Sequence, residues 1–284
     1  TMIVIHRDRH FSSFSSSSVE RAIEMINYLI ANTSVKKELA AGFSATMNSP
    51  YTAMERLVKV ADLPNVGESL TAYGLATIFQ NMAVTNLEMR KEAFEGKEVT
   101  MEAYDEMQKM GKTEAEKEVI DSKVDLQELC NNRIKKMVSA NVPRAMIAIM
   151  EGASEHTLEQ SLLGLKRMAS EPSVRGQMIQ QGVLSACIKQ EKNETPTETD
   201  TMKKYIRCAC HTIAKILITT NPSLLTSAQR LGSTKPLIQL IRDTNTLDLD
   251  VFEALMSVTN IASSGEDAKN RIVAERGIAA LHYG

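Results

Sequence analysis

One pattern recurs along this 284-residue chain and constrains its fold more than any other feature. Each copy has a long apolar stretch at helical spacing, a short polar turn, a shorter helical segment and a break that is often a glycine. The breaks include Gly182, Gly232 and Gly277, where the chain must reverse sharply and glycine tolerates a positive φ. The long stretches predict helices at residues 19–31, 72–83, 162–169, 211–217 and 254–262.

A single copy of this pattern cannot bury its own apolar face, so neighbouring copies must stack to form a continuous core. The spacing of roughly 40–50 residues is typical of the armadillo and HEAT class of helical repeats. We therefore predict an all-α fold, an armadillo-repeat superhelix of stacked three-helix units in which the third helix is the longest. The alternative is a helical bundle without repeats, which does not account for several partly matching units.

Three polar segments interrupt the pattern. Residues 12–18 are rich in serine and are interpreted as a linker that leads into the first long helix. Residues 88–125 carry closely spaced charges of both signs with few apolar anchors, which is typical of a solvated helix or a mobile insertion. Residues 191–201 are predicted to form a polar loop between two units.

The charge balance and the apolar composition narrow the class of partner. Lys and Arg number 33 against 35 Asp and Glu, so there is no electrostatic reason to expect nucleic acid or an anionic membrane as the main partner. The chain has no Trp and 16 Met, which suits a core of interlocking helices. Most of these methionines are predicted to lie in that core, among them Met25, Met168 and Met256.

The sequence lacks the short motifs that carry common enzyme chemistry. It has no glycine-rich phosphate loop, no His-Glu-x-x-His zinc motif and no nucleophile elbow around a serine. The best metal candidate is the run from Cys208 to His211, but its ligands point in different directions on one helix and lack a second cluster. We therefore expect no enzyme, no catalytic residue, no cofactor and no metal. The four cysteines are interpreted as reduced thiols, with Cys208 and Cys210 buried between helices.

Two stretches resemble the UCS family of myosin-directed chaperones. They are residues 73–81 (YGLATIFQN) and residues 252–262 (FEALMSVTNIA). Supporting stretches occur in the family's order, and the resemblance covers most of the chain from about Val19 onward; these stretches are residues 134–140, 214–222 and 271–277. The resemblance implies an armadillo fold, a cytoplasmic location near the contractile apparatus, and folding and assembly of the myosin motor domain together with heat shock protein 90.

Animal members of the family carry a TPR domain, a central armadillo domain and a UCS domain. The TPR domain docks heat shock protein 90, and no TPR pattern is visible in this sequence. From their composition, residues 1–17 are interpreted as a linker or disordered segment. By resemblance, residues 18–130 are central armadillo repeats with the charged insertion 88–125. Residues 131–284 correspond to the N-terminal part of a truncated UCS domain, from which much of the client surface is missing.

The third helix of an armadillo repeat lines the concave face, and superposing the units gives one polar position in each of them. These polar positions are Tyr28, Asn81, Arg167, Lys215 and Asn260. A polar group buried without a partner costs about 1–3 kcal/mol, so each of these side chains requires one. Two interpretations have equal weight: the five residues form a ladder that hydrogen-bonds an extended client segment, or each braces the backbone of the neighbouring repeat.

The same positions separate the possible partners. Nuclear-import armadillo proteins hold basic peptides between Trp side chains, which this chain lacks, so that function is disfavoured. A catenin-like adaptor that binds acidic peptide partners fits Arg167 and Lys215 and is the main alternative to a chaperone. An enzyme is a distant third possibility.

Overall fold

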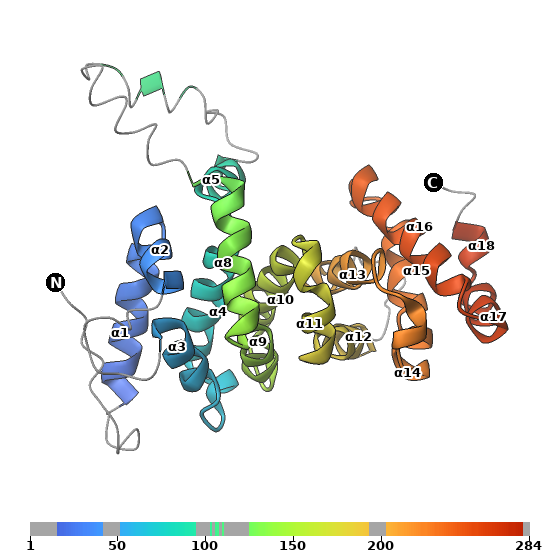
Figure 1. Ribbon diagram of the computed structural model, residues 1–284, viewed down its shortest axis with the longest axis horizontal. Coiled ribbons are helices and arrows are strands. Elements are labelled where there is room, and N and C mark those ends of the chain that lie inside the picture. The colour runs from blue at the N-terminus through green and yellow to red at the C-terminus, as the bar shows by residue number, and fades with distance from the viewer. Residues whose placement is uncertain are drawn as a thin grey trace.

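The computed structural model describes residues 16–41, 52–94, 125–192 and 203–280, together with residues 103, 106, 107 and 110. The described helices follow one another along an elongated stack, with α1 at one end and α18 at the other (Figure 1). No described residue forms a strand, and the predicted all-α armadillo-type stack is confirmed. The helices are α1 (Ser16–Leu29), α2 (Thr33–Ala41), α3 (Ala53–Ala61), α4 (Leu70–Met82), α5 (Asn86–Phe94), α8 (Gln127–Ser139), α9 (Val142–Met150), α10 (Glu155–Ala169), α11 (Arg175–Gln180), α12 (Val183–Lys192), α13 (Lys204–Leu217), α14 (Ser227–Gly232), α15 (Thr234–Arg242), α16 (Asp248–Ala262), α17 (Glu266–Ala274) and α18 (Gly277–Ala280), with short 3₁₀ turns at Val66–Glu68, Pro172–Val174 and Pro222–Leu224.

Four three-helix units fill most of the stack, and each ends in a long third helix that packs on the third helix of the unit before it. The units are α2–α3–α4, α8–α9–α10, α11–α12–α13 and α14–α15–α16, with α1 as an earlier third helix. The predicted long helices lie where expected but begin earlier: α10 begins at Glu155 and α13 at Lys204. The first turn of α10 is polar, so the apolar pattern alone could not mark its start. A side-chain cap does so for α10, where Ser154 accepts a hydrogen bond from the backbone N–H of Thr157.

The reversals between the first two helices of a unit only partly follow the glycine prediction. Gly182 has the expected positive φ of 90°. At the corresponding turns Asn141 and Arg276 take left-handed conformations, and Asn65 does so in the turn between α3 and α4; asparagine adopts this conformation more readily than most residues. The expected positive φ at Gly232 and Gly277 was wrong. A Cβ at position 277 would lie 2.9 Å from the Ile272 carbonyl oxygen, so close packing accounts for that glycine.

The core runs without interruption through the units and is built mainly from Ile, Leu, Val, Ala and Met. Met168 is fully buried in it as predicted, but Met25 and Met256 are 47% and 45% exposed, so their assignment to the core was wrong. All four cysteines are free and buried, which confirms the interpretation of Cys208 and Cys210 as packed thiols. Burial raises the pKa of Cys187 to about 12, so that thiol stays protonated at neutral pH.

A buried ionic cluster joins α2 to α8 and to the turn that follows α4. Arg133 donates to both carboxylate oxygens of Asp125, at 2.6 and 2.7 Å, and to the carbonyl oxygens of Met82 and Val84, each at 3.1 Å. Lys36 Nζ donates to the same Val84 oxygen at 2.9 Å and lies 3.7 Å from Asp125. Burial, followed by the charge of Arg133, lowers the pKa of Lys36 to about 8. The cluster ties together helices that are distant in sequence.

Several predicted segments fall partly outside the described residues. Helix α5 and Asp125 lie at the two ends of the predicted insertion 88–125, while the stretch between them, residues 1–15 and residues 193–202 are not described, apart from the four isolated positions. The predicted domain boundary after Cys130 falls inside α8, and the division into two domains stays a prediction. Among the described helices, none has the length and apolar character needed to cross a membrane.

Candidate protein-binding face

Four successive third helices, α4, α10, α13 and α16, pack side by side and form one continuous layer. We call the solvent-facing positions of these helices the groove face. Stacked repeats of this class use such a layer as an extended binding surface, because a small rotation per unit curves the layer. The residues on this face therefore decide what the chain can bind.

The two most N-terminal ladder residues have little in common. Tyr28 on α1 is 82% exposed, and Asn81 near the end of α4 is half-buried. Close to Tyr28, the Asn27 side chain donates to the carbonyl oxygen of Gly74 on α4 at 3.1 Å. The polar brace between these two helices is therefore supplied by Asn27, which the superposition of the units did not select.

The next two ladder residues form ion pairs. Arg167 on α10 donates to the Glu92 carboxylate of α5 at 2.5 Å and to the Gln80 carbonyl oxygen at 3.4 Å. Lys215 on α13 donates to both carboxylate oxygens of Glu253 on α16, at 3.0 and 2.8 Å. Each cation is thus bound to an acid from a different helix of the chain.

Asn260 follows the bracing interpretation closely. Its side-chain amide donates to the carbonyl oxygens of Leu217 and Thr220, at 2.7 and 2.8 Å. Leu217 is the last residue of α13, where a helix has no intrahelical donors left for its carbonyls, and Thr220 lies in the turn that follows. Asn260 therefore closes the C-terminus of the preceding third helix. The proposed role of the five ladder residues in client binding stays a prediction.

Helix α13 carries a row of basic groups at every fourth residue, each facing an acid near α16. Arg207 lies 2.5 Å from Asp243, His211 Nδ1 lies 3.4 Å from Asp250, and Lys215 follows with Glu253. Spacing of four residues places the three side chains on one face of the helix. The row connects α13 to the end of α15 through Asp243 and to α16 through Asp250 and Glu253, and sequence reasoning found only its last member.

His211, the middle basic residue of the row, is uncharged. His211 is buried, and neither ring nitrogen makes a hydrogen bond within the described part of the chain. Burial, together with the positive charges of Lys166, Lys215 and Arg207, lowers the pKa of His211 to about 3. The imidazole is therefore uncharged at neutral pH.

Apolar side chains are exposed at both ends of the groove face. Helix α4 exposes Leu70 and Tyr73, and α16 exposes Leu249, Phe252 and Met256. Sequence reasoning missed them because it assigned apolar residues of these helices to the core. A signal was present: Tyr73 and Phe252 each lie eight residues before the ladder asparagine of their helix. Aromatic and methionine side chains are enriched in protein–protein interfaces, so these exposed residues suit protein binding.

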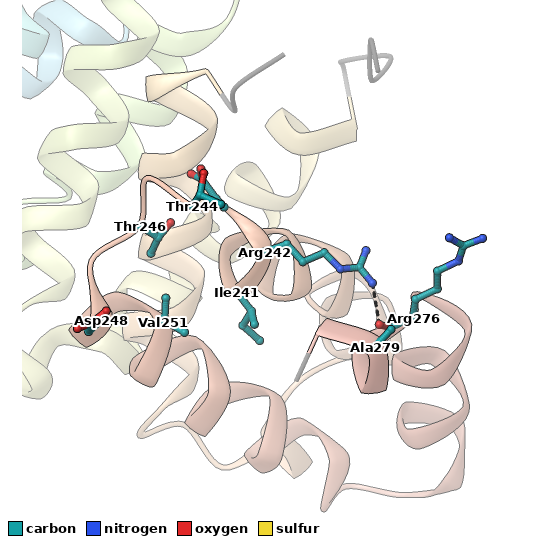
Figure 2. Close-up of a pocket in the computed structure, with 9 residues that line it drawn as sticks. Ile241, Arg242, Thr244, Thr246, Asp248, Val251, Arg276 and Ala279 are labelled. Carbon is teal, nitrogen blue, oxygen red and sulfur yellow. Dashed lines mark hydrogen bonds between the residues drawn. The ribbon is translucent and has the colours of Figure 1, made fainter. Parts of the chain in front are cut away.

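A shallow cavity of about 620 Å³ lies at the corner between α15, α16 and α18 (Figure 2). Across it, Arg242 donates to the carbonyl oxygen of Arg276 at 2.7 Å. Asp243 also lines the cavity; although burial raises its pKa, hydrogen bonds from Arg207 and Asn245 lower it overall. These contacts connect the corner to the α13 row and stabilise the last described unit.

No protein-family model matches this chain. Individual proteins that resemble it in sequence were found. The chain is 25% identical to protein unc-45 homolog B of Xenopus laevis over 265 residues, which are 92% of this chain and 25% of that protein. The human unc-45 homolog B is also 25% identical, over 262 residues, 90% of this chain and 25% of the relative. The chain thus spans about a quarter of the length of the curated relatives it matches.

Solved structures give the same answer for the fold. The C. elegans myosin chaperone UNC-45, solved with an Hsp90 peptide, superposes with a TM-score of 0.69 at 21% identity, over 96% of this chain and 26% of that one. Drosophila melanogaster UNC-45 superposes with a TM-score of 0.65 at 23% identity, over 96% of this chain and 31% of that one. A designed armadillo repeat protein superposes with a TM-score of 0.58 at 15% identity, over 95% of this chain and 86% of that one. The chain therefore resembles the UNC-45 proteins in sequence and shares their armadillo-type fold, which confirms the resemblance to the UCS family of myosin chaperones.

Proposed function

We propose that this chain is a non-enzymatic, protein-binding armadillo scaffold of a myosin-directed co-chaperone. It binds the myosin motor domain as its client and assists the folding and assembly of that domain in the cytoplasm. The observation that carries the proposal is the similarity to UNC-45 proteins over nine-tenths of the chain, combined with their fold.

The groove face supports client binding through its mixture of groups. Polar ladder positions near the ends of the third helices lie between apolar residues of α4 and α16, such as Tyr73 and Phe252. An unfolded or partly folded client presents both exposed backbone groups and apolar side chains. A surface with apolar anchors and hydrogen-bonding groups can hold such a segment without requiring one sequence.

Heat shock protein 90 is the second proposed partner. The C. elegans UNC-45 structures include one with an Hsp90 peptide and one with an Hsp70 peptide. In the family resemblance this contact belongs to a TPR domain, and this sequence shows no TPR pattern. We therefore assign client binding, and not chaperone docking, to the helices described above.

The proposal is tested by heating the myosin motor domain with and without this chain and recording light scattering. A chaperone scaffold reduces the scattering at near-stoichiometric ratios, whereas an unrelated protein at the same concentration does not. A catenin-like adaptor for acidic peptides, the alternative function, would leave aggregation unchanged. Scattering that is equal with the chain and with the control protein would refute the chaperone function.

A further inference from the structure

Arg167 and Lys215 take their acidic partners from different parts of the fold: Arg167 from α5, and Lys215 from the following third helix. Lys215 is bound by Glu253, which stands seven residues before Asn260 on the following third helix. The residue seven positions before Lys215 on α13 is Cys208, whose buried thiol cannot supply a negative charge. The following third helix therefore offers Arg167 no acid at the position where Lys215 finds one.

Helix α5 provides the missing acid from outside the repeat pattern. Glu92 Oε2 lies 2.5 Å from Arg167 Nη2, although the two residues are 75 positions apart. The Arg167 side chain is 9% exposed, while that of Glu92 is 53% exposed. The arginine is thus covered by a carboxylate that itself remains open to solvent.

The attachment of α5 to the stack is mainly polar. None of its described side chains is buried. Its N-terminus is capped by Thr85, which exchanges hydrogen bonds with Glu88, and Asn86 donates to Thr33 at 2.6 Å. Lys36 also reaches the sulfur of Met89 at 3.5 Å. A short helix with little buried apolar area can shift at low free-energy cost.

A second cation stands beside Arg167 in the last turn of α10. Lys166 is half-buried, and its side-chain ammonium forms no ion pair or hydrogen bond within the described part of the chain. Its charge acts on the neighbouring third helix, since it helps to lower the pKa of His211. The C-terminus of a helix favours positive charge, so both cations are stabilised there. Of these two cations, only Arg167 has a carboxylate partner within the described residues.

We propose that Lys166 and Arg167 form a binding site for an acidic side chain of the client, and that Glu92 of α5 occupies this site in the free chain. This inference rests on the proposed function and specifies the chemistry of the client segment. Binding exchanges one carboxylate for another on Arg167 and adds the unpaired Lys166. The client segment is thus acidic where it crosses the end of α10, and α5 acts as its internal competitor.

The test measures fluorescence anisotropy of a fluorescein-labelled octaglutamate peptide, with octaglutamine as the neutral control, at low ionic strength. Glu92→Gln is expected to tighten octaglutamate binding about fivefold, the scale of a partly exposed ion pair, and to leave octaglutamine unchanged. Asp267→Asn is the matched control. It removes one negative charge, as Glu92→Gln does, but from the ion pair that Asp267 on α17 forms with Arg230 on α14. That variant is expected to change neither affinity measurably.

Two further variants locate the site. Arg167→Gln is expected to abolish the gain from Glu92→Gln, and Lys166→Gln to reduce octaglutamate affinity without altering the thermal unfolding curve. Equal tightening by Glu92→Gln and Asp267→Asn, or no tightening by Glu92→Gln, would overturn the inference. Either result leaves the aggregation assay with the motor domain untouched, so failure of this site and failure of the chaperone function are separate outcomes.

Discussion

The Arg133 guanidinium holds both carboxylate oxygens of Asp125 in a site closed to solvent. Lys36 lies near the same carboxylate, so one buried acid faces two buried basic groups, from α2 and α8. Through Lys36, this cluster connects the units that begin with α2 and α8 by charge as well as by apolar packing. Removing one member of such a cluster leaves the others uncompensated, which is the most costly way to alter a buried ion pair.

Asp125→Asn is therefore expected to lower the free energy of unfolding by about 3–5 kcal/mol, measured by urea denaturation at pH 7. The pair of the exposed Asp267 with Arg230 gives a control, because Asp267→Asn is expected to lower the free energy of unfolding far less than Asp125→Asn. Equal losses in the two variants would show that the buried cluster does not stabilise the stack.

Gly67 allows a close approach between the turn before α4 and the end of α9. A Cβ there would lie 1.9 Å from the Glu151 carbonyl oxygen, so the backbone must move to accept it. Gly67→Ala is expected to destabilise the chain by about 1–3 kcal/mol in urea denaturation. Gly176→Ala on α11 meets nothing within 4 Å and is expected to be neutral or stabilising by up to about 1 kcal/mol. The reverse order of the two variants would contradict this packing.

The buried His211 predicts how stability depends on pH. Its pKa is about 3 in the folded chain and about 6.5 when exposed, so the unfolded chain binds the extra proton. Stability from this group is present above pH 6.5 and is lost as the pH falls toward 3. Between pH 7 and pH 5, the wild type should lose about 1–2 kcal/mol more than His211→Gln. Comparing the wild type with His211→Gln also cancels the contribution of the carboxylates that both proteins contain. Parallel curves of unfolding free energy against pH for the two proteins would contradict the prediction.

A variant of the exposed Phe252 tests client binding without altering the stability of the fold. Its side chain is 57% exposed on α16, so Phe252→Ser is expected to leave the unfolding midpoint nearly unchanged. If Phe252 anchors an apolar client group, the same variant weakens binding of the motor domain by about tenfold in a titration. Phe79, which is fully buried on α4, is the contrasting case, since Phe79→Ser should unfold the chain. Unchanged binding by the Phe252 variant would remove α16 from the client surface.

The sequence predicted the periodicity of the helices but not which of their faces are covered. The stretch at 254–262 was correctly assigned to a third helix, yet Met256 within it points to solvent. Apolar spacing specifies a stripe, whereas burial depends on whether a neighbouring unit lies against that stripe. For Met168 such a neighbour is present; for Met256 on the groove face it is not.

The polar contacts were less accessible to sequence reasoning, because their partners are distant. Lys36 and Asp125 are unremarkable charges in the sequence, and nothing local indicates that they meet inside the core. Superposing the units did place Arg167, Lys215 and Asn260 in register. It could not show that Arg167 binds Glu92, 75 residues away, or that Lys215 binds Glu253, 38 residues away. Nor could it show that Asn260 binds backbone carbonyls at the end of α13 and in the turn after it, 43 and 40 residues away.

The most direct test of the account is the affinity of this chain for the myosin motor domain, measured with Asn260 and Lys215 both replaced by alanine. Below the melting temperature, helicity by circular dichroism should stay intact while affinity falls about tenfold or more. A double variant of the exposed pair on α17, Glu266→Ala with Lys269→Ala, should bind like the wild type. Unchanged affinity in the groove variant would contradict the central claim that the third-helix face binds the client.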